Sequence, residues 1–159
     1  MVPMTTLERL TADLKTSMKA RTAFRTNTVR QMIAAVRAAE KSGPIARDLT
    51  DEQVQAVLAA EVKKRRESAQ IYAAAGATER ATTETTEADL IEAYLPAAIG
   101  PDQLDALVAD AIATTGATSL KDMGKVMKAA NAAAATVGRV DGKALSGAVR
   151  QALSGGSVV

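Results

Sequence analysis

Residues 50–76 read TDEQVQAVLAAEVKKRRESAQIYAAAG, and this stretch is the strongest indication of the fold. Thr50 and Gln53 have the spacing of a capping box, in which the side chain of each residue accepts a hydrogen bond from the backbone N–H of the other. Apolar side chains then recur at helical spacing, and Gly76 is placed to adopt the left-handed conformation that ends many helices. The apolar stripe consists of Val54, Val57, Leu58, Val62, Ala69 and Tyr72. The stretch therefore predicts one long amphipathic helix.

The same period predicts helices before and after this stretch. Thr5 and Glu8 form another capping box, and Leu7, Leu10, Leu14 and Met18 follow it along one helical face, to about residue 19. A second helix is expected around the stripe Val29, Met32, Ile33 and Val36, and the Ser-Gly-Pro sequence at 42–44 ends it. A fourth helix is expected from about residue 78 to residue 95, where Pro96 ends it. Four helices therefore account for the first 96 residues.

A short link between Pro96 and Pro101 is the best candidate for a domain boundary, since two prolines and Gly100 bracket it. Beyond it, three apolar stripes predict three helices, which begin near Pro101, Ser119 and Asp141. Residues 155–159 show no pattern, and we expect them to be frayed. We therefore predict an all-α protein with an N-terminal domain of about four helices (1–96) and a C-terminal three-helix bundle (97–159).

Composition excludes several classes of chemistry. Among the 159 residues, 47% are hydrophobic, but there is no Cys and no His, which removes disulfides, thiolate nucleophiles, Cys/His zinc sites and imidazole proton shuttles. The three aromatic residues, Phe24, Tyr72 and Tyr94, are too few for the stacking platforms of single-strand RNA binders. No apolar run reaches the roughly 20 residues that span a bilayer. We therefore expect a cytoplasmic protein without metal, cofactor or membrane contact.

Acidic residues of the fourth expected helix are a poor candidate for a catalytic centre. They are Glu84, Glu87, Asp89 and Glu92. Carboxylates without a neighbouring His, Cys or phosphate-binding loop rarely form an active site, and the spacing of the glycines from 124 to 147 matches no such loop. We therefore expect no independent catalysis by this chain.

Positive charge is concentrated in the last third of the sequence, although the net charge of the whole chain is only +2. Residues 101–118 contain three Asp and no Lys or Arg, whereas residues 119–153 contain six basic and two acidic residues. Lys121, Lys125 and Lys128 have the spacing of one outward line on a helix, opposite Met123, Val126 and Met127. One interpretation of this line is that the lysines contact phosphates. The other is that they form the ordinary solvated face of an amphipathic helix.

Two other basic groups are open to the same two interpretations. Lys63, Lys64, Arg65 and Arg66 span a full helical turn, so they cannot all face one phosphate backbone, and we interpret them mainly as a solvated face. Residues 1–38 contain seven basic and two acidic residues. Within them, Arg21 and Arg25 at the expected corner between two helices could hold a phosphate, although an ordinary surface explains them equally well.

Two segments carry a resemblance to a known family. Residues 119–128, SLKDMGKVMK, followed by residues 138–143, GRVDGK, closely resemble the GatB/YqeY family. The segments LERL at 7–10, VKKR at 62–65 and YLP at 94–96 fit its N-terminal half, so the resemblance spans nearly the whole chain. The C-terminal bundle is similar to the helical tail of the GatB subunit of the tRNA-dependent amidotransferase, which converts misacylated Glu-tRNA or Asp-tRNA to the amide. In that enzyme the tail helps to hold tRNA.

The resemblance implies a tRNA-binding module that assists the amidation of misacylated tRNA. Carried onto matching positions, it implies that the RNA backbone is contacted by Lys121, Lys125, Lys128, Arg139 and Lys143, with Arg150 as a further candidate. Recognition would depend on shape and phosphate geometry, because A-form RNA hides its base edges in a deep groove.

Members of the family are often labelled carbon–nitrogen ligases with glutamine as amide donor. The amidotransferase needs a kinase-like cradle with metal and a glutaminase subunit, and nothing in these residues supplies either. Two alternatives to tRNA binding therefore stay open. One is a non-catalytic module that docks a helical face on another protein, for example the amidotransferase itself. The other, an independent amidotransferase-like enzyme, predicts amide formation by the purified chain alone with glutamine and ATP.

Overall fold

The computed structural model describes residues 2–155, in which all regular elements are helices and no β-strand occurs. The prediction of an all-α fold is confirmed. The chain divides into two compact units, unit 1 (Met1–Leu95) and unit 2 (Pro96–Val159). Each unit has its own hydrophobic core and is described by itself. The C-terminal end is predicted to be frayed from residue 155. Gly155 is the last residue of the last helix, and residues 156–159 lie outside the described residues.

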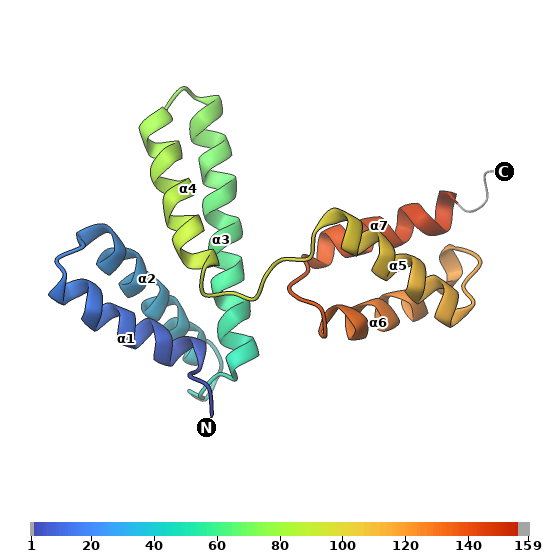
Figure 1. The fold of residues 1–159 in the computed structure, drawn as a ribbon, viewed down its shortest axis with the longest axis horizontal. Helices are drawn as coiled ribbons and strands as arrows, with labels where there is room; N and C mark the ends of the chain where they lie inside the picture. The colour runs from blue at the N-terminus through green and yellow to red at the C-terminus, as the bar shows by residue number, and fades with distance from the viewer. Residues whose placement is uncertain (1, 156–159) are drawn as a thin grey trace. The chain divides into compact units, whose positions relative to one another are not determined.

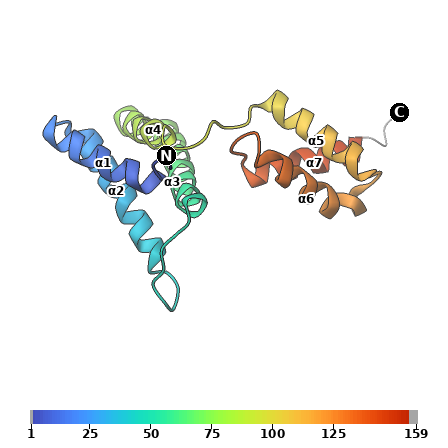
Figure 2. The ribbon, with the colours of Figure 1, turned by 60° about the horizontal axis from the view of Figure 1, so that its bottom comes forward.

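Unit 1 consists of two helical hairpins (Figures 1 and 2). Its helices are α1 (Thr6–Lys19), α2 (Ala23–Glu40), α3 (Asp51–Ala74) and α4 (Thr78–Glu92). Both predicted capping boxes are present: the Thr5 hydroxyl accepts from the Glu8 N–H at 3.2 Å, and the Thr50 hydroxyl accepts from the Gln53 N–H at 3.2 Å. The fourth helix ends at Glu92, three residues earlier than expected, because the chain turns there before Pro96.

The predicted apolar stripes form the core of unit 1. Its buried residues are Leu10, Val29, Met32, Val36, Val54, Leu58, Val62, Ala88, Ile91, Tyr94 and Leu95. Met18 departs from the prediction, since its side chain is half exposed in the last turn of α1, where the chain leaves the helix. A guanidinium nitrogen of Arg30 lies 3.7 Å from its sulfur.

Arg65 is a buried cation within the core-facing stripe of α3. Its Nη2 donates to Gln31 Oε1 of α2 at 2.7 Å, its Nε to Glu87 Oε2 of α4 at 2.8 Å, and its Nη1 to Glu61 Oε2 at 3.0 Å. The prediction of a solvated face is correct for Lys63 and Lys64 and wrong for Arg65. The reason is helical register, because a residue three positions after Val62 lies on the core side of the helix.

Arg66 extends this network toward the end of α4. Its Nη2 lies 2.7 Å from Asp89 Oδ1 and 2.6 Å from Glu92 Oε2. The hydrogen bond to Asp89, and then the one to Glu92, raise the pKa of the Arg66 guanidinium. Three of the four acidic residues that the sequence offers as a catalytic cluster therefore hold α4 against α3: Glu87, Asp89 and Glu92.

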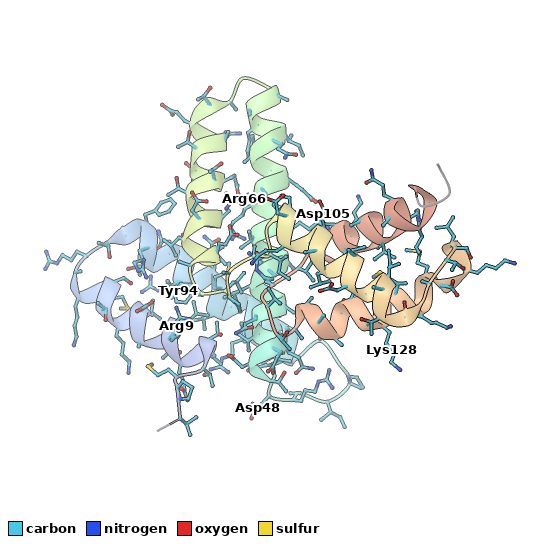
Figure 3. All side chains as sticks on the ribbon, turned by 45° about the vertical axis from the view of Figure 1, so that its right-hand side comes forward. Arg9, Asp48, Arg66, Tyr94, Asp105 and Lys128 are labelled. Atoms are coloured by element: carbon cyan, nitrogen blue, oxygen red, sulfur yellow. The ribbon has the colours of Figure 1, made fainter. Side chains whose placement is uncertain are left out.

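Tyr94, just after α4, links the end of that helix to α1 and α2 (Figure 3). Its hydroxyl donates to Asp13 of α1 and accepts from Arg25 of α2 at 3.2 Å. The guanidinium of Arg9 lies 5.1 Å from the centre of the ring and donates to the Tyr94 carbonyl at 3.3 Å. Burial, followed by the hydrogen bond to Asp13, raises the pKa of Tyr94 to about 12. Arg25, a candidate phosphate contact from its position in the sequence, is therefore engaged within the protein.

Unit 2 is a small helical bundle. Its elements are α5 (Pro101–Thr115), a single 3-10 turn η1 (Leu120–Asp122), α6 (Met123–Ala134) and α7 (Gly142–Gly155). Gly116 adopts the left-handed conformation predicted for the end of α5, with φ 69°, and the Asp141 carboxylate caps α7 by accepting from the Ala144 N–H at 3.1 Å. The bundle buries Leu107, Val108, Ala111, Val126, Ala130, Ala134, Leu145, Val149 and Leu153.

The helix expected to begin at Ser119 is a 3-10 turn followed by α6. The Ser119 hydroxyl accepts from the Lys121 N–H at 3.4 Å, and the Asp122 carboxylate accepts from the Thr118 N–H at 3.0 Å. These local bonds hold the tighter turn in place of a first α-helical turn. As a result Leu120, expected in the apolar stripe, is half exposed.

A short backbone bridge closes the bundle at the loop between α6 and α7. The Ile99 N–H donates to the Arg139 carbonyl at 2.8 Å, and the Arg139 N–H donates to the Ala97 carbonyl at 3.0 Å. Gly138 precedes this bridge, and a Cβ built there would lie 2.5 Å from the Ala97 carbonyl oxygen. Only glycine therefore fits without a shift of the backbone.

Within residues 2–155, none of the helices combines the length and the apolar character that crossing a lipid bilayer requires.

Candidate nucleic-acid interface

The outward face of α6 carries two of the cations expected to contact RNA. Lys125 and Lys128 lie about one turn apart, and both are exposed. Lys128 can be followed in Figure 3. Val126, on the opposite side of the helix, is fully buried, and Met123 and Met127 are partly buried against the same core. The apolar anchoring of α6 therefore directs both ammonium groups to solvent.

Lys121 lies just before them, in η1, and is also exposed. Its neighbour Asp122 is the acidic residue closest in sequence to these lysines. The hydrogen bond from the Thr118 N–H holds the pKa of the Asp122 carboxyl below its usual value, and the Ser119 N–H and the charge of Lys125 act in the same direction. Asp122 is therefore a charged helix-start residue that offsets part of the local positive charge.

Lys143 and Arg150 lie two turns apart on α7, and both are exposed. Successive residues of an α-helix are about 100° apart, so Arg150 lies on nearly the opposite side of α7 from Ala148 and Ala152, and Lys143 lies on the same side as Arg150. The two alanines line the groove between α5 and α7 that is described below. These two cations therefore lie on a different side of α7 from the groove.

Arg139 differs from the other five candidates, since it is only partly exposed and its backbone forms the bridge to residues 97–99. Among the described residues, the other five form no ion pair and are defined here as the unit 2 cations: Lys121, Lys125, Lys128, Lys143 and Arg150. Helix α5 carries only acidic charges, Asp102, Asp105 and Asp110, so the positive charge of unit 2 lies on η1, α6, α7 and the loop that joins α6 to α7.

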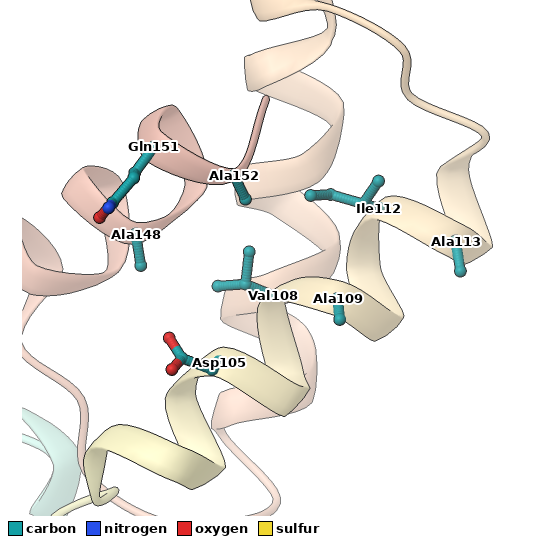
Figure 4. Close-up of a pocket in the computed structure, with 8 residues that line it drawn as sticks. All are labelled: Asp105, Val108, Ala109, Ile112, Ala113, Ala148, Gln151 and Ala152. Carbon is teal, nitrogen blue, oxygen red and sulfur yellow. The ribbon is translucent and has the colours of Figure 1, made fainter. Parts of the chain in front are cut away.

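An apolar groove of about 590 Å³ lies between α5 and α7 (Figure 4). Its walls are formed mainly by Val108, Ala109, Ile112, Ala148 and Ala152, and Asp105 lies at one end. Sequence reasoning missed this groove. The available signal was a pair of alanines four residues apart on each wall, at 109 and 113 and at 148 and 152.

In the part of the chain that the structure describes, no three acidic side chains are close enough together to hold a metal ion.

The profile of the Yqey-like protein family matches residues 7–153. The chain belongs to the YqeY-like family. The expectation of family membership, based on residues 119–143 and the N-terminal segments, is thus confirmed. The matched part of this YqeY-like protein runs from the first turn of α1 to the last turn of α7 and includes all six residues expected to contact RNA. No curated protein matches the sequence of this YqeY-like protein.

Proposed function

We propose that this YqeY-like protein binds tRNA through the unit 2 cations. The observation that carries the proposal is that five exposed cations are concentrated on η1, α6 and α7 of one small bundle, and that none of them forms an ion pair with a described residue. In unit 1, by contrast, Arg65 and Arg66 are held by four acidic side chains. A surface cation without an internal partner loses little when it exchanges water and counterions for a phosphate, and the released counterions favour binding.

Contacts to the sugar–phosphate backbone, rather than to bases, suit the composition of unit 2. All three aromatic residues of the chain, Phe24, Tyr72 and Tyr94, belong to unit 1, so unit 2 has no ring on which a base could stack. Lysines act as flexible point charges, whereas sequence reading of RNA depends on stacking and on fixed hydrogen bonds to base edges. We infer recognition by shape and charge.

The physiological role that we infer is assistance to the amidation of misacylated tRNA. The support for it is the similarity of the C-terminal bundle to the helical tail of the amidotransferase GatB subunit. The carbon–nitrogen bond would then be formed by the amidotransferase, with this protein holding the tRNA.

Replacing Lys121, Lys125 and Lys128 together by glutamine tests the tRNA site. The slope of log affinity against log salt is negative, and its magnitude is called the salt slope below. Each phosphate contact that is lost should lower the salt slope by about 0.7–0.9. Three lost contacts should therefore lower it by about 2–3 and weaken binding by about 100-fold at 0.1 M salt. Filter binding with purified tRNA at several salt concentrations measures both quantities. The matched control is Lys63→Gln with Lys64→Gln, which removes two exposed lysines of α3. Unchanged tRNA binding by a folded triple variant would contradict the proposal.

The groove between α5 and α7 supports a second candidate function, the binding of a partner protein. Its alanine-lined walls leave room for a helix to approach closely, and α5 carries acidic residues but no basic one. The occupant that fits is a helix of the partner with small apolar side chains on one face and a Lys or Arg that meets Asp105. The resemblance to the GatB/YqeY family makes the amidotransferase the first partner to test.

Two exposed alanines of α5 provide a matched pair for that test, because Ala109 lines the groove and Ala106 does not. Ala109→Lys places a charge in the apolar groove and repels a basic partner, so we expect it to weaken binding of the purified, RNA-free amidotransferase by about tenfold or more. Ala106→Lys should leave binding unchanged. Calorimetry with both variants measures the difference, and equal affinities would exclude the groove as the docking site.

A further inference from the structure

The hairpin of α1 and α2 contains a positive segment that the proposed function does not use. Residues 14–39 carry six basic residues and no Asp or Glu. They are Lys15, Lys19, Arg21, Arg25, Arg30 and Arg37. The two helices pack side by side along the hairpin, as Figures 1 and 2 show. The segment therefore concentrates positive charge on one hairpin of unit 1.

Ion pairs within the hairpin divide these residues into two groups. Arg25 pairs with Asp13 at 3.3 Å, and Arg37 pairs with Glu40 at 3.0 Å. The other four are exposed and form no ion pair with any described residue: Lys15, Lys19, Arg21 and Arg30. We refer to these four as the α1–α2 cationic face.

The four cations lie at the same end of the hairpin, near the turn that joins the two helices. Lys15 and Lys19 are one turn apart in the second half of α1, and Arg21 lies in the turn itself. Arg30 projects from α2 toward α1, where its Nη2 lies 3.7 Å from the sulfur of Met18. No Asp or Glu lies between residues 14 and 39, and the bordering Asp13 and Glu40 pair with Arg25 and Arg37.

Arg21 occupies a backbone conformation that disfavours an arginine. Its φ is 57°, and the other described residues with positive φ are Gly76 and Gly116, both glycines at helix ends. The turn is held by the Thr22 N–H, which donates to the Ser17 carbonyl at 3.0 Å, and by the Arg21 N–H, which donates to the Met18 carbonyl at 3.2 Å. This is a Schellman motif, in which glycine avoids the steric cost that an L side chain incurs. The cation is thus present in spite of a cost in stability.

We propose that the α1–α2 cationic face is a second phosphate-binding surface, which contacts the backbone of an RNA. The proposal goes beyond the function assigned to unit 2, because all of its contacts belong to unit 1. Four exposed cations without ion pairs lie on the second half of α1, in the turn and on the first half of α2, and each contact to a phosphate would release counterions.

An RNA fits this surface better than a lipid bilayer. Binding in a bilayer interface requires a helix with a continuous apolar face opposite its charged face. In this hairpin the apolar faces are used by the core, since Leu10, Val29, Met32 and Val36 are fully buried. The large apolar side chains left half exposed near the turn are Met18 and Phe24. They are too few to anchor the hairpin in lipid.

The decisive experiment compares four forms of the full-length protein in tRNA titrations over a range of salt concentrations. The forms are the wild type, the unit 1 variant Lys15→Gln/Lys19→Gln/Arg30→Gln, the unit 2 variant Lys121→Gln/Lys125→Gln/Lys128→Gln, and the combination of both. We expect each triple variant to lower the salt slope by about 2–3 and the combination to lower it by about the sum. Circular dichroism confirms that each form is folded.

The outcomes separate the two proposals. A lower slope for the unit 2 variant alone overturns the α1–α2 cationic face and leaves the proposed function standing. A lower slope for the unit 1 variant alone supports the α1–α2 cationic face and overturns the proposed function of the unit 2 cations. Unchanged slopes in all forms overturn both proposals. Sedimentation with phosphatidylserine vesicles addresses the membrane. If the unit 1 variant loses vesicle binding but keeps the salt slope of the wild type for tRNA, the RNA proposal is overturned in favour of a lipid surface.

Arg21→Gly gives an independent readout, because it should change stability and binding in opposite directions. Glycine relieves the left-handed conformation, so we expect the thermal midpoint of unit 1 to rise by a few degrees. The loss of one cation should lower the salt slope for tRNA by about one. An unchanged slope would contradict a phosphate-binding role for Arg21, and a lower midpoint would contradict the stability cost of its backbone conformation.

Discussion

Arg65→Ala is expected to lower the free energy of unfolding of unit 1 by about 3–5 kcal/mol. The side chain of Arg65 is only 10% exposed and donates hydrogen bonds to Glu61, Glu87 and Gln31. Its removal leaves two largely buried carboxylates without their cation and opens a cavity at the junction of α2, α3 and α4. An unpaired buried charge is among the costliest consequences of a single substitution.

The distribution of aromatic residues makes this prediction simple to measure. The chain has no Trp, and both of its tyrosines, Tyr72 and Tyr94, belong to unit 1. Urea unfolding followed by tyrosine fluorescence therefore reports on unit 1 alone. Lys64→Ala is the matched control, because Lys64 is the preceding residue of α3 and is exposed, and its change should stay within about 0.5 kcal/mol.

A double substitution separates the loss of charge pairing from the loss of packing. Arg65→Met with Glu87→Leu removes the Arg65–Glu87 ion pair while filling space with apolar atoms, so it should recover part of the stability that Arg65→Ala loses. Equal costs for Arg65→Ala and Lys64→Ala would show that the network around Arg65 does not stabilise unit 1.

Gly138→Ala is expected to destabilise unit 2 by about 1–3 kcal/mol. The new Cβ would lie 2.5 Å from the Ala97 carbonyl oxygen, which is a backbone atom and cannot swing aside as the end of a side chain can. The bridge between Arg139 and residues 97–99 must therefore shift, and its hydrogen bonds of 2.8 and 3.0 Å should lengthen or break. The same shift would move Arg139, one of the residues expected to contact RNA.

Hydrogen exchange at the backbone amides of Ile99 and Arg139 measures the loss of the bridge directly. Far-UV circular dichroism follows the helices of both units, and tyrosine fluorescence identifies the part of the transition that belongs to unit 1. Gly147→Ala is the matched control, since an added Cβ there meets no atom within 4 Å beyond its chain neighbours and the backbone of its own helix, and alanine favours the interior of α7. It should stabilise unit 2 by about 0.5–1 kcal/mol. Similar effects of the two substitutions would contradict the structural role of Gly138.

Two groups of arginines and lysines in this protein have different consequences for function. Arg25, Arg65 and Arg66 bind acidic side chains of their own unit and hold helices together. The unit 2 cations and the α1–α2 cationic face carry exposed charge without such partners. Substitutions in the first group should therefore act on stability, whereas substitutions in the second should act on the salt dependence of RNA binding.

Helical periodicity, capping residues and the positions of Pro and Gly predicted the α-helices of the described residues, but not the 3-10 turn before α6 or the early end of α4. The boxes at Thr5 and Thr50 and the stops at Gly76 and Gly116 depend on neighbours within a few residues, so they can be read locally. The resemblance of residues 119–143 pointed to the family for a similar reason, because the motif lies in one continuous segment.

The roles of individual charged side chains were decided by tertiary structure. Arg65 differs from Lys64 only by one step of helical rotation, yet its partners Gln31 and Glu87 come from helices that are 34 and 22 residues away. The groove between α5 and α7 likewise depends on how two distant stripes of alanine face each other. Burial and pairing depend on residues that are distant along the chain, so composition and spacing indicate where charge lies, while packing alone determines which charges remain available for a partner.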